Sequence, residues 1–284
     1  MLKTTVIISV GYIDRYPLVL AQVRILQNGT LPPDEIIIVT NPGKIFQKMK
    51  EISGVSVYIT EEKTPMGSRY VGISHANNDI VSFLDDDEIP ESTWLEKIVE
   101  VHKKGAIVVG GQIKPLYGAP RWLPEEFYWL IGITAFTEKE IRNPYGGNMS
   151  VLRSALKKIQ IDNEFIKWAL QGEEMSLCLK IEKEFGRRAT YTPDAVVYHV
   201  PPPGKLKYSY LLKRSYWQGK HKKMAEKRGY LLQEERDTLR NIGKGIAKYL
   251  TSPAKLFSLV LFTTAVLIGY LMGDWRKVDG LRER

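Results

Sequence analysis

Three consecutive aspartates follow an apolar run in this sequence, and their type and position are suited to binding a cation. Asp85, Asp86 and Asp87 come directly after residues 80–84, whose apolar and partly β-branched composition predicts a short buried strand. Adjacent carboxylates repel one another, which raises the cost of ionising all three. Mg²⁺ and Mn²⁺ offset that repulsion, because they bind through one or two carboxylates plus substrate phosphates. One aspartate could instead cap a helix predicted from Glu91, but three exceed what capping needs. We therefore predict a metal and phosphate site at the carboxyl end of a strand, where open α/β sheets bind ligands.

Two further acids and a histidine lie where they could join this chemistry. Glu173 and Glu174 lie in the first turn of a helix predicted to end near Phe185, and either acid could serve only the helix dipole. One of them near the metal site would instead be a general base. His199 ends a predicted strand, where it is either structural or a further metal ligand.

Residues 114–148 differ in composition from the regular segments around them. Gly146 and Gly147 permit close approach of the backbone to a ligand, or form only a turn. The segment before them is rich in proline and aromatic residues, including Trp122 and Phe127. We expect an irregular lid or acceptor wall there, with aromatics that fill a core as the alternative.

The elements that must position these residues alternate between strands and helices. The predicted strands cover residues 4–10, 35–39, 55–59, 80–84, 106–112, 149–152 and 191–200. The predicted helices cover residues 16–26, 44–52, 67–77, 91–102 and 171–185. This alternation predicts an α/β fold with a mostly parallel, covered sheet. The absence of GxGxxG and GxxxxGK[ST] motifs argues against a dinucleotide fold and a P-loop.

The C-terminal third is basic and then apolar, which is typical of attachment to an anionic membrane. Residues 205–248 hold thirteen Lys or Arg against four Asp or Glu, whereas the net charge of the whole chain is +9. Residues 256–273 carry no charge and would form a helix of about 27 Å, close to the usual bilayer span. We expect a membrane helix that spans or lies partly in the bilayer, with a buried core helix as the alternative. A spanning helix with this basic flank would place the catalytic part on the cytoplasmic face of the cell membrane.

Other partners and compartments are less consistent with the sequence. No helix-turn-helix, zinc-finger or aromatic RNA-binding signature accompanies the basic residues, so we expect no nucleic-acid partner. Cys178 is the one cysteine, which excludes an intramolecular disulfide and fits a reducing compartment.

Four short motifs carry a family resemblance. They are, in order, Phe83-Leu84-Asp85-Asp86-Asp87, Tyr145-Gly146-Gly147-Asn148-Met149-Ser150, Gly172-Glu173-Glu174-Met175-Ser176-Leu177-Cys178, and Tyr198-His199. Over residues 4–230 the chain resembles the family 2 glycosyltransferases with the GT-A fold. That resemblance implies a nucleotide-sugar donor, a divalent metal and inversion of the anomeric centre.

A narrower resemblance covers nearly the whole chain. It rests on residues 126–132, 141–143, 216–219 and 252–273. They are similar to an archaeal branch that includes glucosyl-dolichyl phosphate glucuronosyltransferases, which extend lipid-linked glycans for protein N-glycosylation. The acceptor implied is a dolichyl or polyprenyl phosphate glycan at the membrane, and the donor a UDP-sugar.

The resemblance implies that Asp87, Asp85 and His199 bind Mg²⁺ or Mn²⁺ and that Glu174 is the catalytic base. It implies that the donor is bound by Asp85, Arg69, Asn41, Gly147, Asn148 and Glu173. Two positions differ from the usual pattern. Asn41 follows the second strand where members often carry an Asp for uracil, so we expect base recognition by Asn41 or another group. Glu174 replaces the usual Asp, with the same chemistry and one more methylene.

The predicted organisation has four parts. They are a GT-A catalytic domain at 1–204, a basic helical segment at 205–252, an apolar membrane helix at 253–275 and a polar tail at 276–284. Two other functions stay open. A sugar-phosphate nucleotidyltransferase should carry an early Gly-rich loop with Arg and Lys, which residues 9–16 lack. A non-catalytic membrane scaffold would leave the acids at separate strand and helix ends unexplained.

Overall fold

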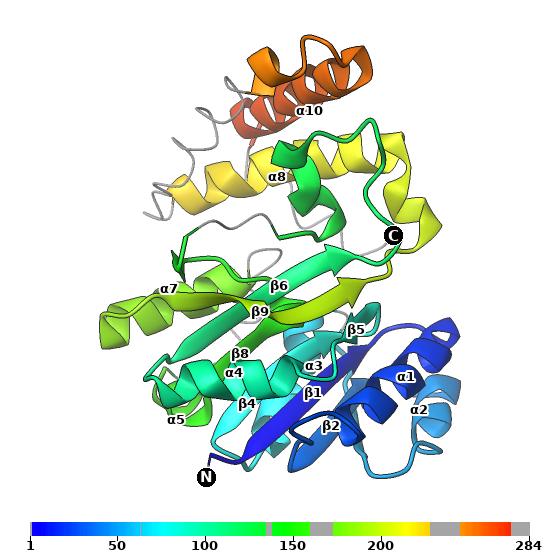
Figure 1. The fold of residues 1–284 in the computed structure, drawn as a ribbon, viewed down its shortest axis with the longest axis vertical. Coiled ribbons are helices and arrows are strands. Elements are labelled where there is room, and N and C mark those ends of the chain that lie inside the picture. Colours follow the sequence, from blue (N-terminus) through cyan, green and yellow to red (C-terminus); the bar gives the residue numbers. More distant parts are fainter. Residues whose placement is uncertain (1, 63, 135–137, 160–172, 228–244, 274–284) are drawn as a thin grey trace. The chain divides into compact units, whose positions relative to one another are not determined.

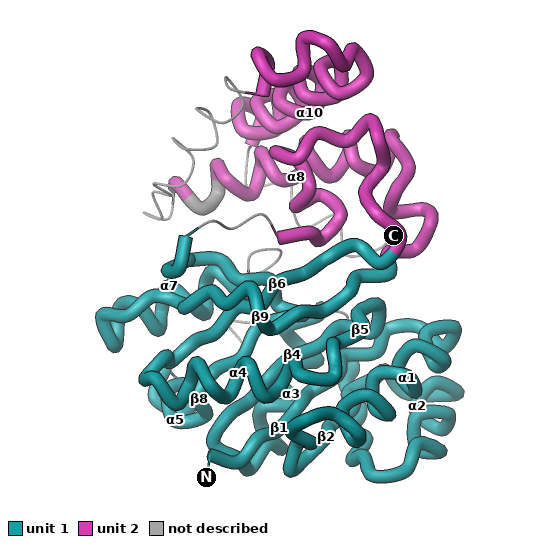
Figure 2. Tube along the Cα trace, viewed as in Figure 1, with its two compact units in different colours: residues 1–116, 136–200 teal, residues 117–135, 201–284 magenta. Residues whose placement is uncertain are grey.

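The structure is a computed structural model, shown in Figure 1, that describes residues 2–62, 64–134, 138–159, 173–227 and 245–273. The chain divides into two compact units, coloured separately in Figure 2. Unit 1 comprises residues 1–116 with 136–200, and unit 2 comprises residues 117–135 with 201–284. Unit 2 thus includes residues 117–135, which were predicted to belong to the catalytic domain, and the roles of the predicted domains stay predictions.

Unit 1 is built on one nine-stranded sheet (Figure 1). Its strands are β1 (Thr4–Val10), β2 (Glu35–Thr40), β3 (Ser56–Ile59), β4 (Ile80–Asp85), β5 (Glu88–Pro90), β6 (Val108–Pro115), β7 (Glu140–Ile141), β8 (Met149–Leu152) and β9 (Ala189–His199). Their order is β3-β2-β1-β4-β8-β6-β9-β5, and β7 pairs with β9. The first four strands are parallel, as predicted. The remainder is mixed, because β8 runs antiparallel to both β4 and β6.

Helices cover both faces of this sheet. They are α1 (Tyr16–Gln27), α2 (Lys44–Met49), α3 (Pro65–His75), α4 (Trp94–Lys103), α5 (Arg153–Lys158) and α7 (Glu173–Phe185). Strand β4 shows the period of two that divides the core: Ile80 and Leu84 pack with α1 and α4, whereas Val81 and Phe83 pack with α3 and α7. A strand buried on both faces reads as a continuous apolar run, which explains why these strands could be predicted.

Strand β5 is an element that the sequence analysis did not predict. It pairs antiparallel with the end of β9, so that Glu88 lies opposite His199. A three-residue strand is too short to show a period, and its pairing partner lies more than a hundred residues away. This pairing brings His199 to the turn that contains the aspartates.

Unit 2 has a core of its own. Its elements are η2 (Glu125–Ile131), η4 (Pro203–Leu206), α8 (Tyr208–Lys227) and α10 (Pro253–Leu271). Phe127, Leu130, Leu211 and Phe262 are buried together, and Trp122 packs against them. The aromatic segment therefore fills a core, which was the alternative to a lid. Residues 228–244 of the basic helical segment predicted at 205–252 lie outside the described residues.

One buried histidine links α4 to the sheet. The His102 ring is hydrogen-bonded to Ala106 O through Nδ1 (2.9 Å) and to Ser150 Oγ through Nε2 (2.9 Å). Ser150 also accepts a hydrogen bond from Ser82 Oγ at 3.0 Å. Burial lowers the pKa of His102 from 6.5 to about 4, since an imidazolium would lose its hydration there.

This pKa predicts a defined loss of stability in acid. Below pH 6.5 the unfolded chain binds a proton that the folded chain does not bind until about pH 4. The contribution is therefore complete above pH 6.5 and is lost as pH falls toward 4, by up to roughly 3 kcal/mol. We expect the gap in unfolding free energy between wild type and His102→Gln to narrow over that range, measured by urea unfolding at several pH values. A gap that is constant with pH would contradict the assignment.

Candidate active site

A single arginine joins two of the predicted site carboxylates. Arg69, 2% exposed, donates through Nη2 to Asp85 Oδ1 at 2.8 Å and through Nη1 to Glu174 Oε1 at 2.7 Å. These residues come from α3, the end of β4 and the first turn of α7. The structure thus brings the predicted donor-side acid and the predicted base together on one guanidinium.

Helical spacing explains how the Arg69 and Glu174 side chains come to face the sheet. On α3, Met66 precedes Arg69 by three residues and is buried against the sheet. On α7, the buried Leu177 and Cys178 follow Glu174 by three and four residues. The cap at Thr64, which accepts the Gly67 N–H at 3.0 Å, fixes where α3 begins.

Charge-assisted hydrogen bonds make the burial of Arg69 tolerable. Its two ion pairs are short, and guanidinium geometry suits simultaneous contact with two carboxylates. Removing one carboxylate would leave part of a buried charge uncompensated, which costs about 3–5 kcal/mol for a fully buried pair. Asp85 and Glu174 are 38% and 23% exposed, so the cost here is smaller.

A second pair lies at the turn between β4 and β5. Asp87 is 6% exposed, and its Oδ1 is 3.4 Å from His199 Nε2. The Val200 N–H donates to Asp87 O at 2.7 Å, which extends the pairing of β5 with β9. Among the described residues, no three His, Cys, Asp or Glu side chains form a ready metal site. The carboxylate oxygen nevertheless fits Mg²⁺ or Mn²⁺, which complete their shells with phosphate and water, and the imidazole nitrogen suits the softer Mn²⁺ better than Mg²⁺.

The other two aspartates have distinct surroundings. Asp85 Oδ1 is engaged by Arg69, which favours a donor-side role for Asp85 over a metal role shared with Asp87. Asp86 Oδ2 accepts the Gly11 N–H at 2.8 Å and so ties the turn to the end of β1. Burial, with a smaller contribution from repulsion by Asp87, raises the pKa of Asp86 to about 6.

Glu88 belongs to the site, although the sequence analysis gave it no role. It is 3% exposed, and its Oε2 accepts the Asp85 N–H at 3.1 Å. Burial, followed by repulsion from Asp85, raises the pKa of Glu88 well above its usual value. The one feature of the sequence that could have indicated a role for Glu88 is its position as the fourth consecutive acid of the run that begins at Asp85. The sequence could not show that β5 turns this acid inward.

The two glycines of η3 (Gly146–Asn148) approach side chains of the site. A β-carbon on Gly146 would collide with Glu174 Oε1 and the Arg69 guanidinium, and one on Gly147 would collide with the Glu88 carboxylate. The backbone of these two glycines was predicted to approach a ligand closely. In the structure it closely approaches the protein's own charged side chains.

The other predicted donor-binding residues are placed as follows. Asn148 is fully buried: it accepts from Trp94 Nε1 at 2.8 Å and donates to Gln112 O and Ala195 O at 2.9 and 3.0 Å. These bonds give its side chain a structural role, so contact with a sugar would fall to its backbone. Asn41 follows β2 and donates to Thr60 O at 3.1 Å. Glu173 begins α7, and its side chain lies outside the described residues.

The fold is of the GT-A type, the fold of nucleotide-diphospho-sugar transferases, with acids gathered where β4 ends. Residues 14–160, just over half of the chain, match Glycosyl transferase family 2. The chain belongs to this family, which confirms the predicted resemblance and makes the protein a glycosyltransferase.

Curated relatives agree with this membership. The chain is 28% identical to the glucosyl-dolichyl phosphate glucuronosyltransferase of Haloferax volcanii, over 96% of each chain. It is 27% identical to the succinoglycan biosynthesis protein ExoM of Rhizobium meliloti, over 59% of this chain and 53% of that protein.

Solved structures confirm the fold. The mannosyltransferase PcManGT from Pyrobaculum calidifontis, in complex with GDP-Man and Mn²⁺, superposes with a TM-score of 0.65. The match covers 97% of this chain and 88% of that one at 15% identity. Such an identity shows a shared fold and no more.

The contact of Gly146 predicts a selective effect of one methyl group. In Gly146→Ala the new β-carbon must displace the Glu174 carboxylate and the Arg69 guanidinium. We expect sugar transfer to fall by about 10–100-fold, with about 1–3 kcal/mol lost in unfolding free energy. Gly204→Ala is the matched control, because a β-carbon there meets nothing within 4 Å. Assays of transfer and of urea unfolding on both variants test this, and wild-type transfer by folded Gly146→Ala would contradict it.

Proposed function

We propose that the protein transfers a sugar from a UDP-sugar to a dolichyl or polyprenyl phosphate-linked glycan, with inversion of the anomeric centre. Glucuronic acid is the sugar to test first, since the full-length relative in Haloferax volcanii is named for its transfer. The observation that carries the proposal is the Arg69 bridge between Asp85 and Glu174, beside the Asp87–His199 pair.

The Asp87–His199 pair would hold Mg²⁺ or Mn²⁺ together with the diphosphate of the donor. When bound, the ion supplies charge that offsets the negative charge of the departing diphosphate. Asp85 and the end of β2 at Asn41 would contact the nucleoside.

Glu174 would take the proton from the acceptor hydroxyl that attacks the anomeric carbon. Its carboxylate is 23% exposed and fixed by Arg69 at 2.7 Å, so it is both reachable by an acceptor and held in position. A single base suffices for one direct displacement, and one displacement inverts the anomeric centre. Arg69 acts here as a positioning residue.

The acceptor side of the proposal rests on the chemistry of unit 2. Helix α10, with a mean hydropathy of 1.8, is the one described helix that is long and apolar enough to cross a membrane. The basic residues of α8 precede it in the chain. A lipid-linked acceptor would meet the enzyme at such a surface, on the cytoplasmic face.

Removal of the proposed metal ligand Asp87 should weaken donor binding only when Mn²⁺ is present. We expect Asp87→Ala to bind UDP at least about 10-fold more weakly than wild type in Mn²⁺ and equally without it, because the carboxylate acts through the ion. Asp194→Ala is the control, since Asp194 is an exposed acid on β9. Calorimetry with and without Mn²⁺ measures both. Metal-independent binding by wild type would contradict the proposal, and no UDP binding would favour a scaffold.

Removal of the proposed base should separate binding from turnover. We expect Glu174→Gln to retain UDP affinity while transfer falls by about 10²–10⁴-fold, the usual worth of a general base. Glu184→Gln, on the same helix in a surface ion pair with Lys158, should keep wild-type transfer. The assay offers UDP-glucuronic acid, UDP-glucose and GDP-mannose with a dolichyl phosphate-linked sugar, and NMR of the product gives the anomeric configuration. A retained configuration, or full activity of Glu174→Gln, would refute the mechanism.

A further inference from the structure

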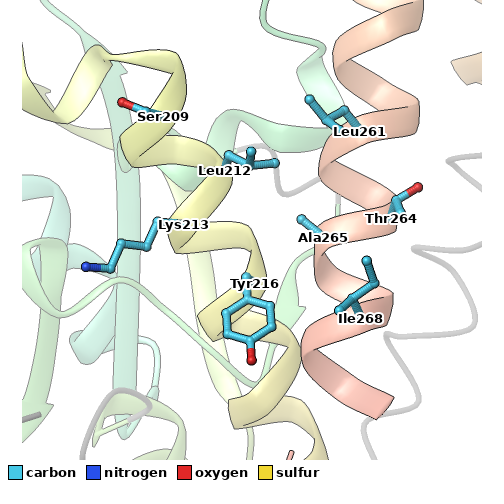
Figure 3. Close-up of a pocket in the computed structure, with 8 residues that line it drawn as sticks. All are labelled: Ser209, Leu212, Lys213, Tyr216, Leu261, Thr264, Ala265 and Ile268. Carbon is cyan, nitrogen blue, oxygen red and sulfur yellow. The ribbon is translucent and has the colours of Figure 1, made fainter. Parts of the chain in front are cut away.

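Helices α8 and α10 run parallel and side by side along their whole length. Near their starts, Tyr208 Oη donates to Ser258 Oγ at 3.1 Å. Near their ends, Tyr270 Oη donates to Glu226 Oε2 at 2.6 Å. Figure 3 shows side chains of both helices facing one another between these points.

Toward the C-terminal end of α10, the backbones of the two helices come into direct contact. A β-carbon on Gly219 would collide with Val266 O, and one on Gly269 would collide with Tyr216 O. Small residues at a crossing permit this approach, and the packed face of α10 continues through Leu259, Phe262 and Ala265. The two helices therefore form one structural piece.

The charge on α8 decides where this piece can lie. The helix carries Lys213, Arg214, Lys220, Lys222, Lys223 and Lys227. Lys220 follows directly after Gly219, at the crossing itself. A basic side chain at the centre of a bilayer costs at least about 2.5–3.5 kcal/mol. If α10 crossed the membrane, its partner would carry Lys213, Arg214 and further cations into the hydrocarbon, which disfavours a spanning α10 in this packing.

The face of α10 that turns away from α8 is apolar and exposed. Its large side chains are Phe257, Val260, Leu267 and Leu271, at helical spacing and 47–80% exposed. Beside this face runs a groove of about 400 Å³ between the helices, to which Leu212, Tyr216, Leu261 and Ala265 contribute (Figure 3). Lys213 and Arg214 are exposed on the neighbouring helix. Apolar area next to exposed cations matches the acyl boundary and the anionic headgroups of a lipid leaflet.

We propose that α8 and α10 together form an interfacial platform that lies in the plane of an anionic membrane and does not cross it. The apolar face of α10 enters the acyl boundary, and the cations of α8 contact headgroups. The chain that follows α10 then stays on the same side of the membrane as unit 1. This inference goes beyond the proposed function, because it holds whatever sugar and acceptor the enzyme uses.

Sidedness tests the platform directly. Single cysteines at Glu61, exposed in unit 1, and at Arg284, in the polar tail, are labelled with a membrane-impermeant maleimide in sealed vesicles. Wild type serves as the unlabelled control. Its one thiol, Cys178, is buried, and burial raises its pKa, so that little of the reactive thiolate is present. We expect the two positions to be labelled to the same extent before detergent is added. Labelling of Glu61→Cys with protection of Arg284→Cys until detergent would show a spanning helix and overturn the proposal.

Lipid binding tests the faces. The full chain should co-sediment with vesicles that contain about one third phosphatidylglycerol, and the double variant Val260→Asp/Leu267→Asp should lose at least about 10-fold in affinity. Ile59→Asp places one such charge on an exposed apolar residue of unit 1 and should bind as wild type does. The proposal would be overturned if the double variant bound the vesicles as wild type does. It would also be overturned if wild type formed a dimer without lipid and only the double variant lost that dimer, because the apolar face would then bind a second copy of the chain. Neither readout uses sugar transfer, so a failed donor assay leaves the test intact.

Discussion

The site depends on a buried cation held between two acids. Arg69 is almost wholly enclosed, and its guanidinium is bonded to Asp85 on one side and Glu174 on the other. A charge in that position is costly unless its partners stay in place. The end of β4 and the first turn of α7 are therefore fixed relative to α3. Through this one side chain, the proposed donor site and the proposed base share a common reference point.

The need to keep the charged groups of the site in place also explains several residues that take no part in the proposed reaction. Gly146 leaves the space that the Arg69–Glu174 pair occupies, and Gly147 does the same for Glu88. Gln22, on α1, donates to Asp85 O at 2.7 Å and also to Glu88 O, which restrains the acidic turn from the opposite side. Asn148 then ties η3 to Trp94 and to two neighbouring strands. These neutral groups act together with Arg69 to hold the acids in place against their mutual repulsion.

The sequence predicted those parts of the molecule whose signals are local. The parallel strands β1 to β4 read as apolar runs, and the aspartates mark the end of β4. The motif order that predicted the family also singled out Glu174, which Arg69 joins to Asp85 in the structure. Strand β5 and the inward turn of Glu88 were missed, because they arise from pairing with β9 and leave no periodicity in three residues. The structural role of the Asn148 side chain was equally invisible, since an amide that binds a sugar and one that binds backbone carbonyls look alike in sequence.

The C-terminal helix shows why hydropathy and packing can give different answers about a membrane. Eighteen uncharged residues form a helix that is nearly long enough to span a bilayer. This estimate from length considers the helix in isolation. The structure gives α10 a partner in backbone contact, and the second half of that partner carries four lysines against one glutamate. The unit that must be transferred into lipid is then the pair, and the pair is apolar on one face and cationic on another. The proposed interfacial position follows from this, because each face of such a body would meet there the solvent that it requires.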